Sequence, residues 1–204
     1  MKDLFLHIAS SYEPNLTVLA PLWQELDKQY SQKKRYYHTL AHIENLLRIG
    51  HEHRPMVQDW ETFVFAIFYH DAVYDVLRSD NEEKSASLAE KRLAQIHFPP
   101  HRIADCKALI LATKNHAPSA NTDANLLLDA DLSVLGADWE TYSAYAAQVR
   151  REYSIYPDLV YRPGRRKVLT KFLERDFIFK TPDFRSRLEV QARENIQHEI
   201  LSLQ

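Results

Sequence analysis

The fold is decided by residues 60–71, which read WETFVFAIFYHD. Every residue from Phe63 to Tyr69 is apolar or aromatic, so this segment has no polar face to turn toward water. A helix that is apolar all round is buried in the protein core. A buried strand is also compatible with so short a run, but the flanking residues favour a helix. We therefore predict a central, buried helix that ends at His70 and Asp71.

The segments on either side carry helical patterns. Between the nine prolines, apolar residues recur at i, i+3 and i+4 spacing, and no useful alternating pattern indicates a strand. Only three glycines are present, which argues against a hairpin-rich fold. We expect eight or nine helices, at about Leu16–Tyr30, Leu40–Gly50, Trp60–Phe68, Asn81–His97, His101–Thr113, Ala124–Leu135, Trp139–Tyr153, Arg165–Phe172 and Phe184–Leu203. With no repeat or linker in view, the prediction is one all-α domain over residues 1–204.

The overall composition narrows the classes of function. The 204 residues include 26 Lys and Arg and 28 Asp and Glu, for a net charge of −2. This near balance removes the electrostatic reason to expect a nucleic-acid polymer or a membrane as partner. Three scattered glycines exclude a phosphate-binding glycine loop. The single cysteine, Cys106, excludes a thiolate metal cluster and is expected to be a core residue.

The two ends of the chain suggest a location and leave the oligomeric state open. No secretory signal is visible at Met1–Leu4, and no apolar run approaches the roughly 18 residues of a membrane span. We therefore expect a cytoplasmic protein. The C-terminal segment 184–203 carries an apolar helical stripe. That stripe is compatible with a monomer or a homodimer, and packing on its own domain is the favoured alternative.

Histidine and aspartate side chains gather near the ends of predicted helices. His38 and His42 are four residues apart, a spacing that shares one helix face. His70 and Asp71 end the most apolar segment, where buried polar groups need partners, and a divalent cation would serve both. Asp131 follows a run of leucines. Imidazole and carboxylate ligands suit Mn, Fe, Ni, Co or Zn, although each residue taken singly is also compatible with an ordinary core or surface position.

Taken in order, these residues resemble the HD superfamily of metal-dependent phosphohydrolases. That all-α family carries a His, then a His-Asp pair, then a distant Asp, all on one metal. The strings with this resemblance are RYYHTLAHI at 35–43, FYHDAVYD at 68–75, NEEKS at 81–85 and LDADL at 128–132. They look like the subgroup of predicted HD phosphohydrolases of unassigned substrate, over about residues 20 to 180.

The resemblance implies a set of metal ligands. It assigns His38, His70, Asp71 and Asp131 to the metal, with His42 as a substrate contact or an alternative to His38. The expected cofactor is one divalent ion: Mn, Co, Ni, Fe, Zn or Mg. A second metal stays open, because histidines 101 and 116 fall in the interval where two-metal members carry an extra His, but no adjacent His-His pair is present.

Phosphate hydrolysis also requires proton transfer and positive charge. Asp75 and Glu82 are rival candidates for the general acid or base; the alternatives are a surface residue and a partner of the helix dipole. Arg35 is the favoured phosphate contact, because Arg offers bidentate geometry. Lys114 and His116 are further expected substrate contacts.

The function predicted from the sequence is hydrolysis of a small phosphorylated molecule, with a nucleotide as the leading candidate. A metal ion would lower the pKa of its bound water toward ~7. Two alternatives are a di-iron oxygenase of the HD-like fold, which needs about six His and Asp ligands in that family, and a non-catalytic metal-containing binding or sensor domain. No base-reading motif in the sequence identifies the substrate.

Overall fold

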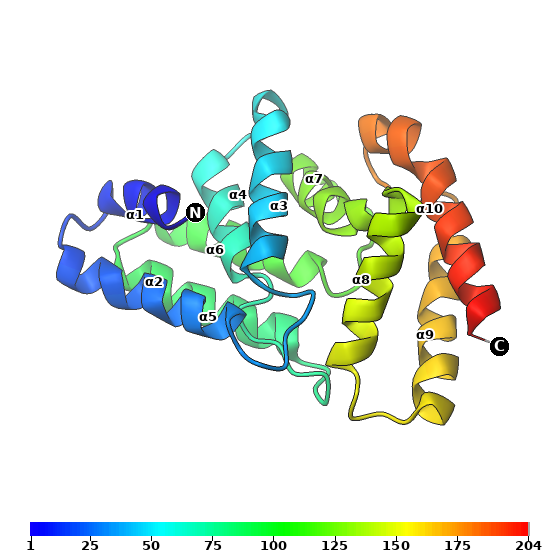
Figure 1. The fold of residues 1–204 in the computed structure, drawn as a ribbon. Coiled ribbons are helices and arrows are strands. Elements are labelled where there is room, and N and C mark those ends of the chain that lie inside the picture. The colour runs from blue at the N-terminus through cyan, green and yellow to red at the C-terminus, as the bar shows by residue number, and fades with distance from the viewer. Residues whose placement is uncertain (204) are drawn as a thin grey trace. The chain divides into compact units, whose positions relative to one another are not determined.

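In a computed structural model, residues 1–203 form ten α-helices and two short 3₁₀ helices, with no strand among them (Figure 1). The all-α prediction is confirmed, with a helix count close to the expected one. The chain divides into two compact units, Met1–Leu127 and the part from Leu128 onward. The expectation of one domain over the whole chain stays a prediction. No helix in residues 1–203 has the length and apolarity needed to cross a membrane.

The first unit contains α1 to α6 and the start of α7. Their bounds are α1 Lys2–Ser10, α2 Leu16–Tyr30, α3 Leu40–Glu52, η1 Arg54–Met56, α4 Trp60–Tyr69, α5 Asn81–Gln95, α6 Pro100–Ala112 and α7 Thr122–Leu132. The second unit continues from the last turns of α7. It contains η2 Ser133–Gly136, α8 Trp139–Glu152, α9 Asp158–Leu173 and α10 Pro182–Ser202.

Helix α4 is the centre of the first unit. All residues from Thr62 to Tyr69 are buried, and the helix packs against α3, α5 and α6. The Asp59 side chain caps its N-terminus by accepting a hydrogen bond from the Thr62 N–H at 3.2 Å. The predicted central helix is therefore confirmed. Its placement carries His70, the next residue, into the interior of the unit.

The start of α4 is also tied to α6 and α7. The Asp123 carboxylate, in the first turn of α7, accepts the main-chain N–H groups of Gln58 and Asp59 at 2.9 Å each. Arg102 of α6 donates to Asp59 and to Glu61. These contacts hold the start of α7 against the helix that precedes His70. Cys106 of the same α6 is buried, as expected, and burial raises the pKa of its thiol.

One helix and one helix start differ clearly from the sequence-based expectation. Helix α1 was not expected, yet Phe5, Ile8 and Ala9 bury one face of it at i, i+3 and i+4. Helix α9 begins at Asp158, seven residues before the expected start at Arg165, and contains Pro163. A proline ring removes one N–H donor, but here the helix continues through it.

In the second unit, α10 packs against η2 and α9. Gly136 allows the contact with η2, since a Cβ there would lie 2.6 Å from the Cβ of Leu188. The Asn195 amide donates to the carbonyls of Leu135 and Ala137 at 2.9 and 2.8 Å. The Asp129 carboxylate accepts the N–H groups that precede α10, described below.

Candidate metal centre

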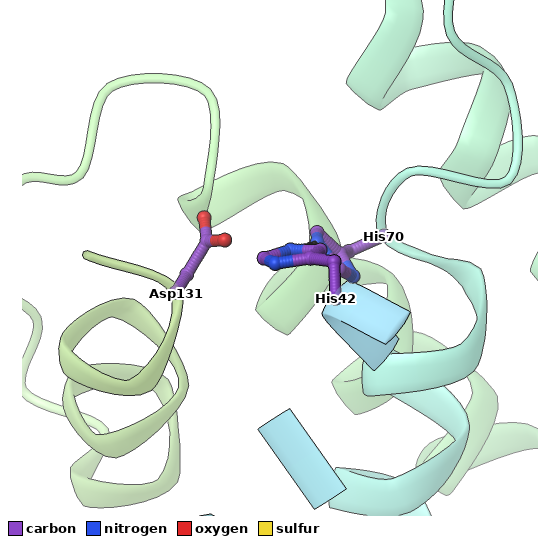
Figure 2. Close-up of side chains that lie close together, drawn as sticks. All are labelled: His42, His70 and Asp131. Carbon is purple, nitrogen blue, oxygen red and sulfur yellow. Dashed lines mark hydrogen bonds between the residues drawn. The ribbon is translucent and has the colours of Figure 1, made fainter. Parts of the chain in front are cut away.

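Two buried histidines of the first unit face each other. His42 lies in the first turn of α3, and His70 follows the last residue of α4. Their side chains are almost fully buried, and the two Nε2 atoms are 3.3 Å apart (Figure 2). The contact therefore joins two imidazoles from segments 28 residues apart in the chain.

The main chain sets the orientation of the His70 ring. Its Nδ1 lies 2.9 Å from the carbonyl oxygen of Ile67, one turn earlier in α4. A carbonyl can only accept, so Nδ1 carries the proton and Nε2 keeps its lone pair in the neutral ring. This is the arrangement that metal-ligating histidines adopt, in which a backbone carbonyl fixes the tautomer.

Asp71 and His38 continue the same cluster toward the surface. Asp71 Oδ2 lies 3.2 Å from His70 Nε2 and 3.9 Å from His38 Nε2. The His38 ring stacks on Tyr74, with ring centroids 4.3 Å apart. The side chains of His38 and Asp71 keep about a fifth of their surface exposed, at 21% and 18%. The cluster thus runs from the interior at His70 to a rim that solvent can reach.

His42, the alternative to the favoured His38, lies 3.3 Å from the buried His70, and the choice of the first ligand stays a prediction. The sequence favoured His38 as the first ligand, with His42 as the alternative. Helix α3 begins at Leu40, so His42 lies inside the helix and His38 in the segment before it. The signal that could have separated them is Thr39, a good N-cap residue that marks the helix start.

The distances inside the cluster suit a bound metal ion. Two N or O ligands that bind one ion at about 2.0–2.2 Å, with angles between octahedral and tetrahedral, lie roughly 2.8–3.6 Å apart. The separations of 3.3 Å between the histidine Nε2 atoms and 3.2 Å from His70 Nε2 to Asp71 Oδ2 fall in this range. The donor set of imidazole and carboxylate is likewise one that transition metals prefer.

Two aspartates near the end of α7 have different surroundings. Asp131 is half-buried in the last turn of α7 and is drawn in Figure 2. Asp129 is fully buried and accepts the main-chain N–H groups of Lys180 and Thr181, both at 2.7 Å. Burial raises the pKa of Asp129 despite these hydrogen bonds. Asp129 therefore anchors the segment before α10, a role that the sequence did not indicate.

Arg35 has main-chain partners in the first unit. Its guanidinium is buried and donates to the carbonyl oxygens of Asp71 at 2.6 Å, Ala72 at 3.0 Å and His38 at 3.3 Å. It also lies over the Tyr74 ring, 5.4 Å from its centroid. Arg35 thus connects the two backbone segments that carry His38 and Asp71. The expected phosphate contact stays a prediction, and the geometry adds a positioning role.

Asp75 and Glu82 lie on the loop after Asp71 and on the helix that follows it. Helix α4 ends at Tyr69, so Asp75 is an exposed loop residue rather than one turn further on a helix. Its carboxylate accepts the Leu77 N–H at 3.0 Å, and its main chain pairs with the Asn81 side chain. Glu82 is half-buried in the first turn of α5. The acid-base roles of both residues stay predictions.

Lys114 and His116 follow the end of α6. The Lys114 ammonium donates to the Ser79 carbonyl at 2.8 Å and pairs with Glu83. His116 is half-buried and has a positive φ of 47°, in the left-handed region. Lys114 therefore holds the loop between Asp71 and α5. The substrate roles of both residues stay predictions.

Comparison with known proteins identifies no family for this chain. No family model, no curated protein and no solved structure matches the chain. The resemblance to the HD superfamily therefore depends on the four sequence strings, and the chemistry of the cluster depends on its own geometry.

Proposed function

We propose that the protein is a metal-dependent phosphohydrolase that acts on a small phosphorylated molecule. The observation that carries the proposal is the convergence of His42 Nε2, His70 Nε2 and Asp71 Oδ2 inside the first unit. Imidazole and carboxylate groups this close are favoured by a shared cation, because buried polar groups need compensation. The order of these residues along the chain also matches the HD pattern described above.

The ligands that we propose are His42, His70, Asp71 and Asp131. His42 and His70 of the first unit and Asp131 of the second each offer a donor atom of a kind that binds metal ions. Asp131 enters the set as the distant Asp of the HD pattern that the sequence resembles. When bound, the divalent ion supplies a Lewis acid and an acidified water for attack on phosphorus.

The remaining roles follow from how the chain holds these residues. Ile67 orients His70 through its carbonyl, and Arg35 holds the main chain of Asp71. His38 lies at the exposed rim, 3.9 Å from Asp71, where its Nε2 can take or give a proton. Asp75 and Glu82 are the carboxylate candidates for the same proton transfer. Lys114 and His116 are proposed substrate contacts, and a nucleotide is the leading substrate class.

The first test is a phosphatase screen over nucleotides and sugar phosphates, run with Mn, Co, Ni and Mg in turn. We expect wild type to hydrolyse at least one substrate only with metal present. The Asp71→Ala variant should lose this activity and hold far less than one metal equivalent, while its helical circular dichroism stays near wild type. Full metal occupancy in purified Asp71→Ala would show that the ligand assignment is wrong.

A matched pair of histidine variants tests which imidazole binds the metal. His42→Ala should lower the metal content far more than His38→Ala, because His42 Nε2 lies 3.3 Å from His70 Nε2 whereas His38 lies at the exposed rim. His38→Ala should instead keep the metal and lose rate, roughly 10²–10⁴-fold if His38 is the acid or base. The reverse result, with metal lost only in His38→Ala, would restore the assignment expected from the sequence.

Metal analysis also separates the two alternatives. Two irons per chain with an oxidised-state absorption band would favour the di-iron oxygenase and contradict the phosphohydrolase. Metal binding with no hydrolysis of any phosphorylated compound would favour the binding or sensor domain.

A further inference from the structure

The second unit contains a cavity of about 270 Å³ between α8 and α9. Apolar and aromatic side chains dominate its lining, with Val149, Val160 and Val168 beside three tyrosines. Small-molecule sites in proteins are mostly apolar clefts of about 300–1,000 Å³ with a few polar groups. The cavity is therefore close to the smaller end of that class.

One wall of the cavity is the backbone of α9 at Gly164. A glycine inside a helix costs about 1 kcal/mol relative to alanine, so a structural reason is expected. For Gly136 the reason is the contact with Leu188, and for Gly50 it is Phe63, 3.0 Å from where a Cβ would lie. A Cβ at Gly164 would meet nothing within 4 Å. The missing side chain is thus not required by the protein itself, and its effect is to leave the cavity open.

The side chains around Gly164 on α9 form a suitable wall for a flat group. Val160 and Val168 lie one turn before and after Gly164, and both are about half exposed, at 55% and 49%. Tyr161 is buried, and Tyr153 and Tyr156 complete the lining from the α8 side. Aromatic rings and exposed aliphatic groups of this kind favour a planar apolar ligand.

The charge around the cavity favours an anion. Residues 150–171, together with Glu199 that pairs with Arg165, carry seven Lys and Arg against three Asp and Glu, whereas the whole chain has 26 against 28. The lining residue Arg165 is paired with Glu199, at 2.7 and 3.0 Å. Arg166 and Lys167, next to it in the sequence, are exposed. A ligand in the cavity therefore lies in a locally positive field, which raises the concentration of anions.

We infer that this cavity binds a small anionic molecule with a flat aromatic group, whose ring lies against Gly164 between the tyrosines. The site is separate in its residues from the metal ligands proposed above, and it does not depend on the proposed function.

Two fluorescent probes that differ in charge test this inference on the full chain. The anion is 8-anilinonaphthalene-1-sulfonate, and the neutral analogue is N-phenyl-1-naphthylamine. We expect saturable binding of the sulfonate at one site per chain, tighter than binding of the neutral probe. Added salt should weaken binding of the sulfonate but not of the neutral probe, because salt screens exposed charges. Equal affinity of the two probes, with no salt dependence, would show that the site does not select an anion.

A variant that fills the cavity gives the decisive test. Gly164→Leu places a side chain in the open space, and we expect at least a tenfold loss of sulfonate affinity. The variant should stay folded, because its Cβ meets no atom and a helical glycine is replaced. Gly164→Ala should fold equally well and cause a smaller loss. The matched control is Ala147→Leu, which adds the same side chain at an exposed position of α8 outside the lining.

Ala147→Leu should bind the sulfonate as wild type does. Wild-type affinity in folded Gly164→Leu, or no saturable binding of either probe to wild type, would show that the cavity is not a ligand site. The thermal unfolding midpoint of each variant, measured without probe, identifies any loss of affinity that comes from misfolding.

Discussion

Buried ionisable groups occur in both units, but those around His70 have partners of another kind than Asp123 of the first unit or Asp129 and Glu199 of the second. In the second unit the carboxylates meet donors: Asp129 accepts two main-chain N–H groups, and Glu199 accepts from Arg165 and from the Tyr142 hydroxyl. In the first unit, His70 Nε2 lies 3.3 Å from His42 Nε2 and 3.2 Å from the Asp71 carboxylate. Burial of a charged residue is therefore a weak sign of a functional site. The kind of atoms that converge separates a structural cluster from a candidate metal centre.

The largest effect on stability is expected in the second unit. Glu199→Ala leaves the guanidinium of Arg165 buried without its bidentate partner, which typically costs about 3–5 kcal/mol. Chemical denaturation should show this loss in the free energy of unfolding, with metal content per folded chain unchanged. The matched control is Glu194→Ala, at an exposed position of the same helix, which should change stability by about 0.5 kcal/mol or less. A loss of metal in Glu199→Ala would contradict the division between the two clusters.

The pH dependence of the free energy of unfolding tests the surroundings of Lys180, which lies beside the buried Asp129. Burial lowers the pKa of Lys180 to about 8 from its ordinary value of 10.5, against the opposing effect of Asp129. The folded state thus binds fewer protons than the unfolded state between about pH 8 and 10.5, so this group makes stability rise with pH in that window. The rise is on the order of 3 kcal/mol, since one pKa unit is about 1.4 kcal/mol.

Denaturation of wild type and Lys180→Met at pH 7, 8, 9 and 10 isolates this contribution. The stability difference between the two proteins should change by about 2 kcal/mol between pH 8 and 10 and by much less between pH 7 and 8. A difference that does not vary with pH would show that Lys180 titrates at its ordinary pKa.

Asp129 and Asp131 lie two residues apart on α7, yet we assign a structural role to Asp129 and metal binding to Asp131. Substituting each residue in turn therefore tests the comparison most directly. Asp129→Asn turns an amide NH₂ toward one of two main-chain donors, and we expect a loss of about 1–3 kcal/mol. Asp131→Asn should lower the metal content and cost less stability in the metal-free protein. Metal titration together with thermal unfolding distinguishes the two. Loss of metal only in Asp129→Asn would exchange the roles of the two residues.

The smallest expected effect is that of Arg35→Lys. An ammonium keeps the charge but lacks the planar fork that reaches the carbonyls of His38, Asp71 and Ala72. Because residues that orient ligands typically change metal affinity 10–100-fold, we expect a loss of about tenfold with the helical circular dichroism unchanged. Cobalt(II) absorption titration measures it. Arg48→Lys, an exposed substitution on α3, is the control and should leave the affinity unchanged.

Within the candidate site, the sequence predicts the order of the ligands along the chain, but it does not predict which of them contact one another. The His70-Asp71 pair could be placed at the end of a buried helix because local apolarity decides that feature. The choice between His38 and His42 depends on where α3 begins and on how that segment meets α4. Arg35 could be identified as a potential donor, but two of its carbonyl acceptors are 36 and 37 residues away.

The sequence by itself determined the all-α class, most helix positions and the burial of α4, because helical periodicity and apolar content act over a few neighbouring residues. Only the tertiary structure decided that α9 runs through Pro163, that Asp129 anchors the start of α10, and that Gly164 opens a cavity. The Asp129 contact joins residues 51 and 52 positions apart in the chain, and the cavity depends on how α8 and α9 meet. Such contacts leave no periodic trace in the sequence, since they depend on which faces of the helices meet.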